Sequence, residues 1–233
     1  MLEALKEKVY QANLELVKQN LVIYTWGNVS AYDHDTGYVV IKPSGVDYDV
    51  MRAKDMVVVD LNGTVIEGDY NPSSDTPTHC VLYSKYPKLN AIVHTHSMWA
   101  TIFSQAKIPV PVLGTTHADY FHGQIPCTRP LTDKEILKNY EYNTGLVIEE
   151  TYRSINHTPH DIPGIIVAEH GPFSFGKTPE DAVHNAKVLE EVAKMAYYTV
   201  KLNPSIDTIN PTLLDKHYLR KHGKNAYYGQ KRK

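Results

Sequence analysis

Three histidines in this chain have the residue type and the spacing to bind a metal ion: His94, His96 and His170. His94 and His96 end the apolar run 91–96, which we expect to be a β-strand. Residues i and i+2 of a strand point to the same face, so the two imidazoles should project together. His170 follows a second apolar run, 164–168. If the two strands lie close together, three imidazoles converge and leave a fourth position open, which is typical of a catalytic zinc site.

The sequence also allows other interpretations of these histidines. A His-x-His pair on a strand is often a surface pair, and His79 and His117 are further possible ligands on spacing alone. The ion is open as well, because three imidazoles suit Zn²⁺ but also Mn²⁺ or Co²⁺.

Two short segments rich in hydrogen-bond donors could bind an anion. Residues 42–45 (Lys-Pro-Ser-Gly) form one turn, and Ser73-Ser74 precedes an expected helix, whose first N–H groups attract anions. A plain turn and a plain helix cap are the alternatives. No Walker-type phosphate loop is present. Asp75, at the same helix start, could cap the helix or reach a metal ion or a substrate.

Two further segments carry groups that can exchange protons. Asp119 lies in a loop of several ionisable residues, 115–120, where an aspartate is more often a turn residue. Tyr228 follows the cationic helical segment 217–222, where a terminal aromatic is more often a docking residue. Neither segment by itself establishes catalysis.

Periodicity and capping signals predict the elements that must position these residues. We expect helices over 2–19, 76–86, 98–105, 133–154 and 178–201, and strands over 38–42, 56–60, 64–66, 91–96, 108–113, 123–126 and 164–168. Hairpin signals such as Asn62-Gly63 occur, and there is no strict β–α–β alternation. The pattern therefore predicts one α/β domain with a mostly antiparallel or mixed sheet covered by helices.

Composition limits the function classes. The 233 residues are 42% hydrophobic, which suits one large domain or at most two small ones. A formal net charge of −2 is not the footprint of a nucleic-acid-binding protein, and we interpret the basic end, 230–233, as a solvated tail.

The expected compartment is a reducing cytoplasm, without a membrane partner. The two cysteines, Cys80 and Cys127, are far apart and form no metal-binding or disulfide pattern. The N-terminal segment lacks the features of a signal peptide, and no run of about 18 apolar residues occurs.

Longer motifs resemble a known family over nearly the whole chain, taken as a single domain of residues 1–233. The chain is similar to the L-ribulose-5-phosphate 4-epimerases, within the class II aldolase/adducin superfamily. The matching stretches are 21–30, 41–48, 72–79, 92–97, 114–121, 170–173 and 213–223.

The resemblance implies a three-layer α/β/α sandwich around a mostly antiparallel sheet, and a homotetramer with active sites at subunit interfaces. By match to the family motifs, the metal ligands would be His94, His96 and His170, with Asp75 nearby at the metal. The phosphate would be held by Asn28, Lys42, Ser44, Gly45, Ser73 and Ser74. The acid–base groups would be Asp119 and Tyr228. The residues supporting the site across the interface would be Thr115, Glu141, His217 and Arg220.

The resemblance also implies a reaction, the metal-dependent conversion of L-ribulose 5-phosphate to D-xylulose 5-phosphate by cleavage and re-formation of the C3–C4 bond. The related fuculose-phosphate aldolases have a glutamate where this chain has Asp75, and that difference favours the epimerase. The alternatives are an aldolase that releases its aldehyde product and a non-catalytic, adducin-type domain. The chain departs from the family pattern at Ala168-Glu169. Because neighbours on a strand face opposite ways, we expect Glu169 to affect the ligands only indirectly.

Overall fold

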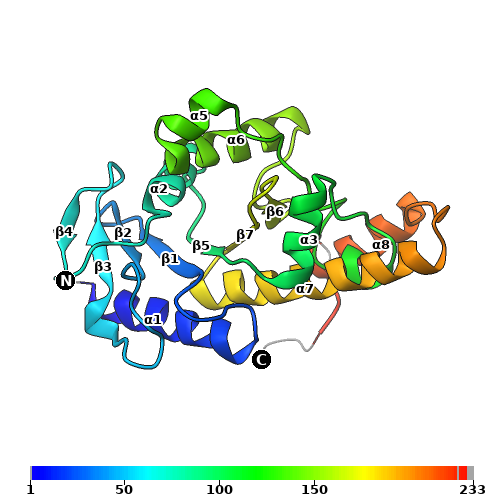
Figure 1. Ribbon diagram of the computed structural model, residues 1–233. Coiled ribbons are helices and arrows are strands. Elements are labelled where there is room, and N and C mark those ends of the chain that lie inside the picture. The colour runs from blue at the N-terminus through cyan, green and yellow to red at the C-terminus, as the bar shows by residue number, and fades with distance from the viewer. Residues whose placement is uncertain (1, 225, 230–233) are drawn as a thin grey trace.

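A computed structural model describes residues 2–224 and 226–229 of the chain (Figure 1). The last residues of the basic tail, 230–233, lie outside this range. The elements in chain order are α1 (Glu3–Lys18), β1 (Asn28–Asp33), β2 (Tyr38–Ile41), the short 3₁₀ helix η1 (Ala53–Asp55), β3 (Val57–Val59), β4 (Val65–Glu67), α2 (Thr76–Lys85), β5 (Ala91–His94), α3 (Met98–Ala106), α4 (Thr115–Ala118), α5 (Asp133–Leu137), α6 (Tyr140–Ser154), β6 (Gly164–Ile166), β7 (Pro172–Gly176), α7 (Pro179–Leu202) and α8 (Pro211–His222).

One sheet lies at the centre, in the order β4-β3-β2-β1-β5-β7-β6 within the described residues. Every adjacent pair in that order is antiparallel. Helices α2, α5 and α6 lie on one side of the sheet, and α1 and α7 lie on the other (Figure 1). The expected three-layer sandwich with a mostly antiparallel sheet is therefore confirmed.

The side chains of each central strand point alternately into apolar cores on the two faces of the sheet. Val29 and Val93 pack in a cluster with residues of α1 and α7. Ile92 instead packs with Leu82 of α2 and Ile148 of α6 in the largest cluster. His94 is two residues after Ile92 and shares its face, so the histidine points toward the α2 and α6 layer.

The register of β5 determines what lies around His94. Asn28 of β1 is directly opposite His94 on one side, and Phe173 of β7 is opposite it on the other. The strand ends immediately after His94, and α3 begins four residues later, after Ser97. The polar residues 94–97 therefore occupy the sheet end where the α2 and α6 helices also start.

The segment 133–154, predicted as one helix, is two helices with a break at 138–139. Lys138 is extended, and Asn139 is left-handed with φ of 57°, a conformation that asparagine tolerates better than most residues. The Asn143 side chain donates to the carbonyl oxygens of Glu135 and Lys138, which satisfies the end of α5. The break lets α6 start afresh at Tyr140.

The prediction of strands at 108–113 and 123–126 is also wrong. Only an isolated bridge forms there, between Val110 and Ile125. By contrast, Thr178 caps α7 as expected, since its side chain accepts from the backbone N–H of Asp181. Both cysteines are free thiols. None of the helices in the described part of the chain is long and apolar enough to cross a membrane.

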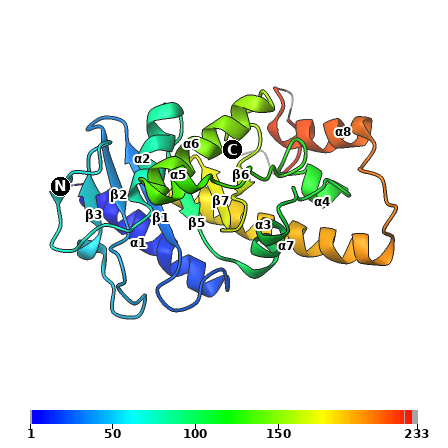
Figure 2. The ribbon, with the colours of Figure 1, turned by 45° about the horizontal axis from the view of Figure 1, so that its top comes forward.

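Gly145 allows α6 to approach α2 closely, and the two helices lie side by side (Figure 2). Their first turns are aligned, because the Thr78 hydroxyl donates to the Glu141 oxygen. A Cβ atom at position 145 would lie 2.8 Å from the Cβ of Val81 and 3.1 Å from the carbonyl oxygen of Thr78. Real Cβ atoms do not tolerate the first of these distances, so the two helices would have to separate.

We expect Gly145→Ala to lower the free energy of unfolding. Alanine gains about 1 kcal/mol of helix propensity over glycine, but overpacking a close contact costs about 1–3 kcal/mol or more. Urea denaturation of both proteins measures the difference. Gly114→Ala is the steric control, because a Cβ there meets nothing within 4 Å, and its loss of stability should be smaller, limited to the weaker N-cap of α4. Equal or greater stability of Gly145→Ala would show that the helix contact is not tight.

Candidate metal and anion site

A cavity of about 390 Å³ opens at the end of the sheet where β5 stops. It is lined by Thr25, Trp26, Gly27, Asn28, Lys42, Pro43, Ser44, Gly45, Ser73, Ser74, Asp75, His94, His96, Tyr140, Glu141 and His170. The three histidines and every residue expected to bind phosphate therefore border one space, although they come from five separate segments of the chain.

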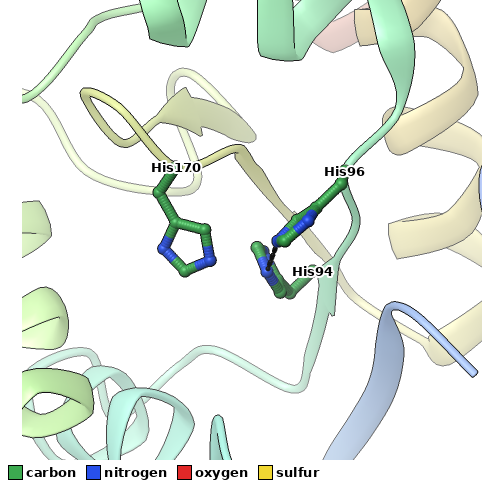
Figure 3. A group of neighbouring side chains, drawn as sticks. All are labelled: His94, His96 and His170. Carbon is green, nitrogen blue, oxygen red and sulfur yellow. Dashed lines mark hydrogen bonds between the residues drawn. The ribbon is translucent and has the colours of Figure 1, made fainter.

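The three histidines converge at one side of this cavity (Figure 3). His94 ends β5, His96 follows it, and His170 lies on the connection between β6 and β7. One ring nitrogen from each lies within 4.8 Å of the other two. The Nε2 atoms of His94 and His96 are 3.1 Å apart. Three nitrogens bound at about 2.0–2.1 Å around a tetrahedral Zn²⁺ would be about 3.4 Å apart, so the His94–His96 pair has the spacing of two such ligands, and His170 is near enough to be the third.

Burial keeps these imidazoles neutral, the form that binds metals. The pKa of His94 is lowered to about 3, first by burial and then by the neighbouring His96. Burial, followed by His94 and His96, also lowers the pKa of His170. Metal ligation requires a deprotonated ring nitrogen, so lone pairs are available there at neutral pH. The Nδ1 atom of His94 donates to the carbonyl oxygen of Pro172 at 3.0 Å, which leaves Nε2 as the ligand atom.

His170 reaches the other two histidines from a tight turn and not from a strand. The turn is closed by a hydrogen bond from the His170 N–H to the Val167 oxygen, and Glu169 within it is left-handed with φ of 65°. The alternation expected for Glu169 therefore does not apply. Its carboxylate instead pairs with Lys107 on the outside of the turn.

Gly171 lets this turn pass beside the histidines. A Cβ atom there would lie 2.7 Å from the Thr95 oxygen and 3.1 Å from a ring carbon of His96. Any larger residue would push His170 away from its two partners.

Asp75 faces the cavity and does not cap α2. Its side chain makes no capping hydrogen bond, and its Oδ2 atom accepts from the Asn28 amide at 2.7 Å. Asp75 is not among the ligand atoms that lie within 4.8 Å of one another, so the three histidines form the metal-type cluster without it. The Oδ1 atom of Asn28 is buried without a hydrogen-bond partner among the described residues. A substrate hydroxyl could supply that missing donor.

Two backbone segments bring the donor-rich turns together. The Ser73 N–H donates to the Lys42 oxygen, and the Ser44 N–H donates to the Asn71 oxygen. These bonds hold residues 42–45 beside residues 71–74 at the mouth of the cavity. The hydroxyls of Ser44, Ser73 and Ser74 therefore gather in one place, as a phosphate site requires.

Lys42 supplies a positive charge to this part of the cavity. Its side chain is only 1% exposed, and its ammonium group donates to the Val46 oxygen at 2.8 Å and lies over the Tyr48 ring. Burial lowers the pKa of Lys42 to about 8, although Asp47 acts in the opposite direction. A bound anion would favour the charged form and relieve this burial cost.

The residues expected as acid–base groups lie outside this cavity, at the α4 and α8 end of the chain. Asp119 binds Arg220 at 2.9 Å and His217 at 3.0 Å, and Lys221 lies 3.5 Å away. Burial raises the pKa of Asp119, but the hydrogen bonds from Arg220 and His217 and the charge of Lys221 outweigh it and keep the pKa below its usual value.

Tyr228 belongs to the same group, because its ring covers the Arg220 guanidinium at 4.8 Å. Thr115 starts α4, also outside the cavity. Glu141, expected among the residues that support the site across the interface, lines the cavity of its own chain. Within one chain, the expected site residues therefore form two separate groups, one at the cavity and one at α4 and α8.

The other candidate histidines have structural contacts instead. His79 is buried, with Nδ1 on the Ser30 hydroxyl, and His117 contacts the Gly123 oxygen. Tyr140 and Trp26 were not predicted as site residues from the sequence, yet both line the cavity. Tyr140 bonds to His170 Nδ1 at 3.1 Å, and Trp26 packs against the His96 ring. Only the position of Tyr140 beside Glu141 could have drawn attention to it.

Anion binding at this site should weaken as the pH rises through about 8. Lys42 is charged below its pKa of about 8 and neutral above it. Affinity for sulfate, an anion whose own charge does not change in this range, should therefore fall about tenfold from about pH 7 to about pH 9 when measured by calorimetry. Lys42→Met should bind more weakly throughout and lose the pH dependence. A flat profile for the unsubstituted protein would remove Lys42 from the anion site.

Comparisons with known proteins agree with this fold. The chain matches the family described as "Class II Aldolase and Adducin N-terminal domain" over residues 7–197. Its fold is similar to that of an L-fuculose 1-phosphate aldolase, with a TM-score of 0.77 and 23% identity over 92% of this chain and 94% of that one.

Two further structures share the fold. One is YgbL of Klebsiella pneumoniae, for which aldolase, epimerase and decarboxylase are the stated alternatives (TM-score 0.70, 24% identity, 93% of this chain and 99% of that one). Another is the L-fuculose 1-phosphate aldolase of Glaciozyma antarctica PI12 (TM-score 0.74, 18% identity, 93% of this chain and 80% of that one). On the match over residues 7–197, this chain belongs to the class II aldolase and adducin family.

Proposed function

We propose that this protein catalyses the metal-dependent epimerisation of L-ribulose 5-phosphate at C4, giving D-xylulose 5-phosphate. The observation that carries the proposal is a single cavity with the three-histidine cluster on one side and the donors of residues 42–45 and 73–74 on another. Such a cavity suits a small phosphorylated ketose, whose carbonyl end and phosphate end need different partners.

The reaction follows from the acidity of the substrate's C–H bonds. The C4 proton is not acidic enough for direct removal, so inversion proceeds by breaking C3–C4. A base takes the C4 hydroxyl proton, the C4–O bond becomes an aldehyde, and the C3–C4 electron pair moves toward the C2 ketone. The fragments are glycolaldehyde phosphate and the enediolate of dihydroxyacetone. The aldehyde turns over, the bond re-forms on its other face, and an acid returns a proton to the oxygen.

His94, His96 and His170 would hold the cation, for which Zn²⁺ is our first choice and Mn²⁺ or Co²⁺ the alternatives. A divalent cation there supplies a Lewis acid that polarises the ketone and stabilises negative charge on its oxygen. Lys42 and the serines of both turns would keep the phosphate fixed while the aldehyde rotates. Asn28 would receive a substrate hydroxyl at its unpartnered Oδ1 atom, with Asp75 orienting its amide.

A second copy of the chain would supply the acid–base groups, in the homotetramer that the resemblance implies. The group of Asp119, His217, Arg220 and Tyr228 lies outside the cavity of its own chain, which supports a proposal in which a neighbouring subunit presents it. In that arrangement Asp119 and Tyr228 would be the acid–base pair, one for each face of the aldehyde, and the cations around Asp119 keep its carboxylate ionised and in place.

An aldolase that releases its aldehyde is the rival function, because two of the similar structures carry that name. Retention or release of the fragments distinguishes the two. Purified protein loaded with Zn²⁺ should convert L-ribulose 5-phosphate to D-xylulose 5-phosphate, followed by coupled assay, without accumulating free dihydroxyacetone.

Chelation should abolish turnover, and added Zn²⁺ should restore it. Stoichiometric release of dihydroxyacetone would instead establish the aldolase. Full activity in a verified metal-free preparation would exclude the metal-dependent mechanism, and no turnover of any sugar phosphate would point to a non-catalytic, adducin-type domain.

Tyr228→Phe should slow epimerisation roughly 10²-fold or more, as expected for loss of an acid–base group, while binding of glycolaldehyde phosphate changes little. Tyr227→Phe is the matched control, because Tyr227 is the neighbouring exposed tyrosine and has no proposed role in the chemistry. Steady-state rates and a calorimetric titration check both variants. Unchanged turnover in Tyr228→Phe would remove this residue from the acid–base role.

A further inference from the structure

The three histidines of the cluster are not held in the same way. His94 is 2% exposed, stacks on Phe173, and has its Nδ1 atom fixed by the backbone oxygen of Pro172. His96 follows directly on the same strand end. His170, by contrast, lies on the turn between β6 and β7, and its ring direction is not determined by a strand.

The side chain that contacts the outer nitrogen of His170 is Tyr140. Its hydroxyl lies 3.1 Å from His170 Nδ1, and its ring is inclined to the imidazole by 33° at a centroid distance of 6.0 Å. When Nε2 of a histidine binds a metal, Nδ1 carries the ring proton and needs an acceptor. The phenol oxygen of Tyr140 is in position to accept that proton's hydrogen bond.

Tyr140 is itself placed by the contact between α6 and α2. Its backbone oxygen accepts from the Thr144 hydroxyl at 3.0 Å, and the next backbone oxygen, that of Glu141, accepts from Thr78 of α2 at 2.6 Å. The close approach at Gly145 draws the helices together one turn farther on. The start of α6 is therefore anchored at two consecutive carbonyl groups, and Tyr140 has a defined position.

We infer that Tyr140 is a positioning residue for the metal: it fixes the rotation and the tautomer of His170, so that Nε2 faces His94 and His96. This inference rests on the metal-dependent function proposed above. The inference adds to that function a side chain that acts on the metal through one of its ligands. The Nδ1 partner of His94 is a backbone oxygen, whereas the Nδ1 partner of His170 is a side chain that a substitution can remove.

The test is a zinc titration of Tyr140→Phe against a chromophoric chelator, without substrate. Loss of the hydroxyl should raise the Kd for Zn²⁺ about 10–100-fold, the usual effect of removing an outer partner of a ligand. Tyr142→Phe is the matched control, since it makes the same change two residues farther along α6 at an exposed side chain, and its affinity should equal that of the unsubstituted protein.

Two readouts separate positioning from a general structural role. The thermal unfolding of metal-free Tyr140→Phe should match that of the unsubstituted protein, and the visible spectrum of its Co²⁺ form should change because the third ligand is no longer aligned. Saturating Zn²⁺ should restore most of its turnover. Turnover that stays low at saturating Zn²⁺ would overturn the positioning role.

The outcomes distinguish this inference from the proposed function. If the unsubstituted protein binds Zn²⁺ and Tyr140→Phe binds it equally well, the role of Tyr140 is disproved while the proposed function stands. If the unsubstituted protein binds no divalent metal, both fail. Should Tyr140→Phe not fold, NMR of the ¹⁵N-histidine-labelled, Zn²⁺-loaded natural sequence decides: a ring N–H of His170 that exchanges slowly supports the contact, and rapid exchange with water overturns it.

Discussion

The register of β5 between β1 and β7 is the constraint on which the rest of the site depends. Antiparallel pairing places Asn28 and Phe173 on either side of His94, and a shift of one residue would turn His94 to the opposite face of the sheet. The correct register lets the ring stack on Phe173 at 4.2 Å and reach His96 and His170. Apolar packing on both faces of the sheet fixes that register, so the hydrophobic cores and the polar site are determined together.

Burial prepares the two parts of the cavity for ligands of opposite charge. Around the histidines, burial favours the neutral ring and thereby prepares lone pairs for a cation. At Lys42, burial weakens the charged form, so the site gains most from a ligand that brings negative charge. A substrate with a carbonyl at one end and a phosphate at the other would suit both parts of the cavity. Its carbonyl oxygen could bind a cation held by the histidines, and its phosphate would favour the charged form of Lys42. The backbone bonds between residues 42–45 and 71–74 hold the two turns of the anion part together.

The division of the expected residues into two groups has a physical origin in the fold. The cavity is formed where the sheet ends and α2 and α6 begin, whereas Asp119, His217 and Arg220 are joined by packing of α8 on α4. Within the second group, one carboxylate is surrounded by several cationic side chains, which gives it a fixed position and charge. In the proposed tetramer, that group would be presented to another copy of the chain.

By itself, the sequence predicted the alternation of the strands, the cap at Thr178 and the shared face of His94 and His96, and its resemblance to a family implied the three-layer architecture and His170 as the third ligand. These predictions follow from local periodicity, capping chemistry and sequence motifs, all of which are visible along the chain without knowing which elements meet. Only the tertiary structure decided the break at Asn139, the turn at Glu169, the pairing of Asp75 with Asn28 and the contact of Tyr140 with His170. Those features depend on which helices and turns meet. The Asp75 and Asn28 side chains, for example, are 47 residues apart in sequence and are joined only when α2 packs against β1.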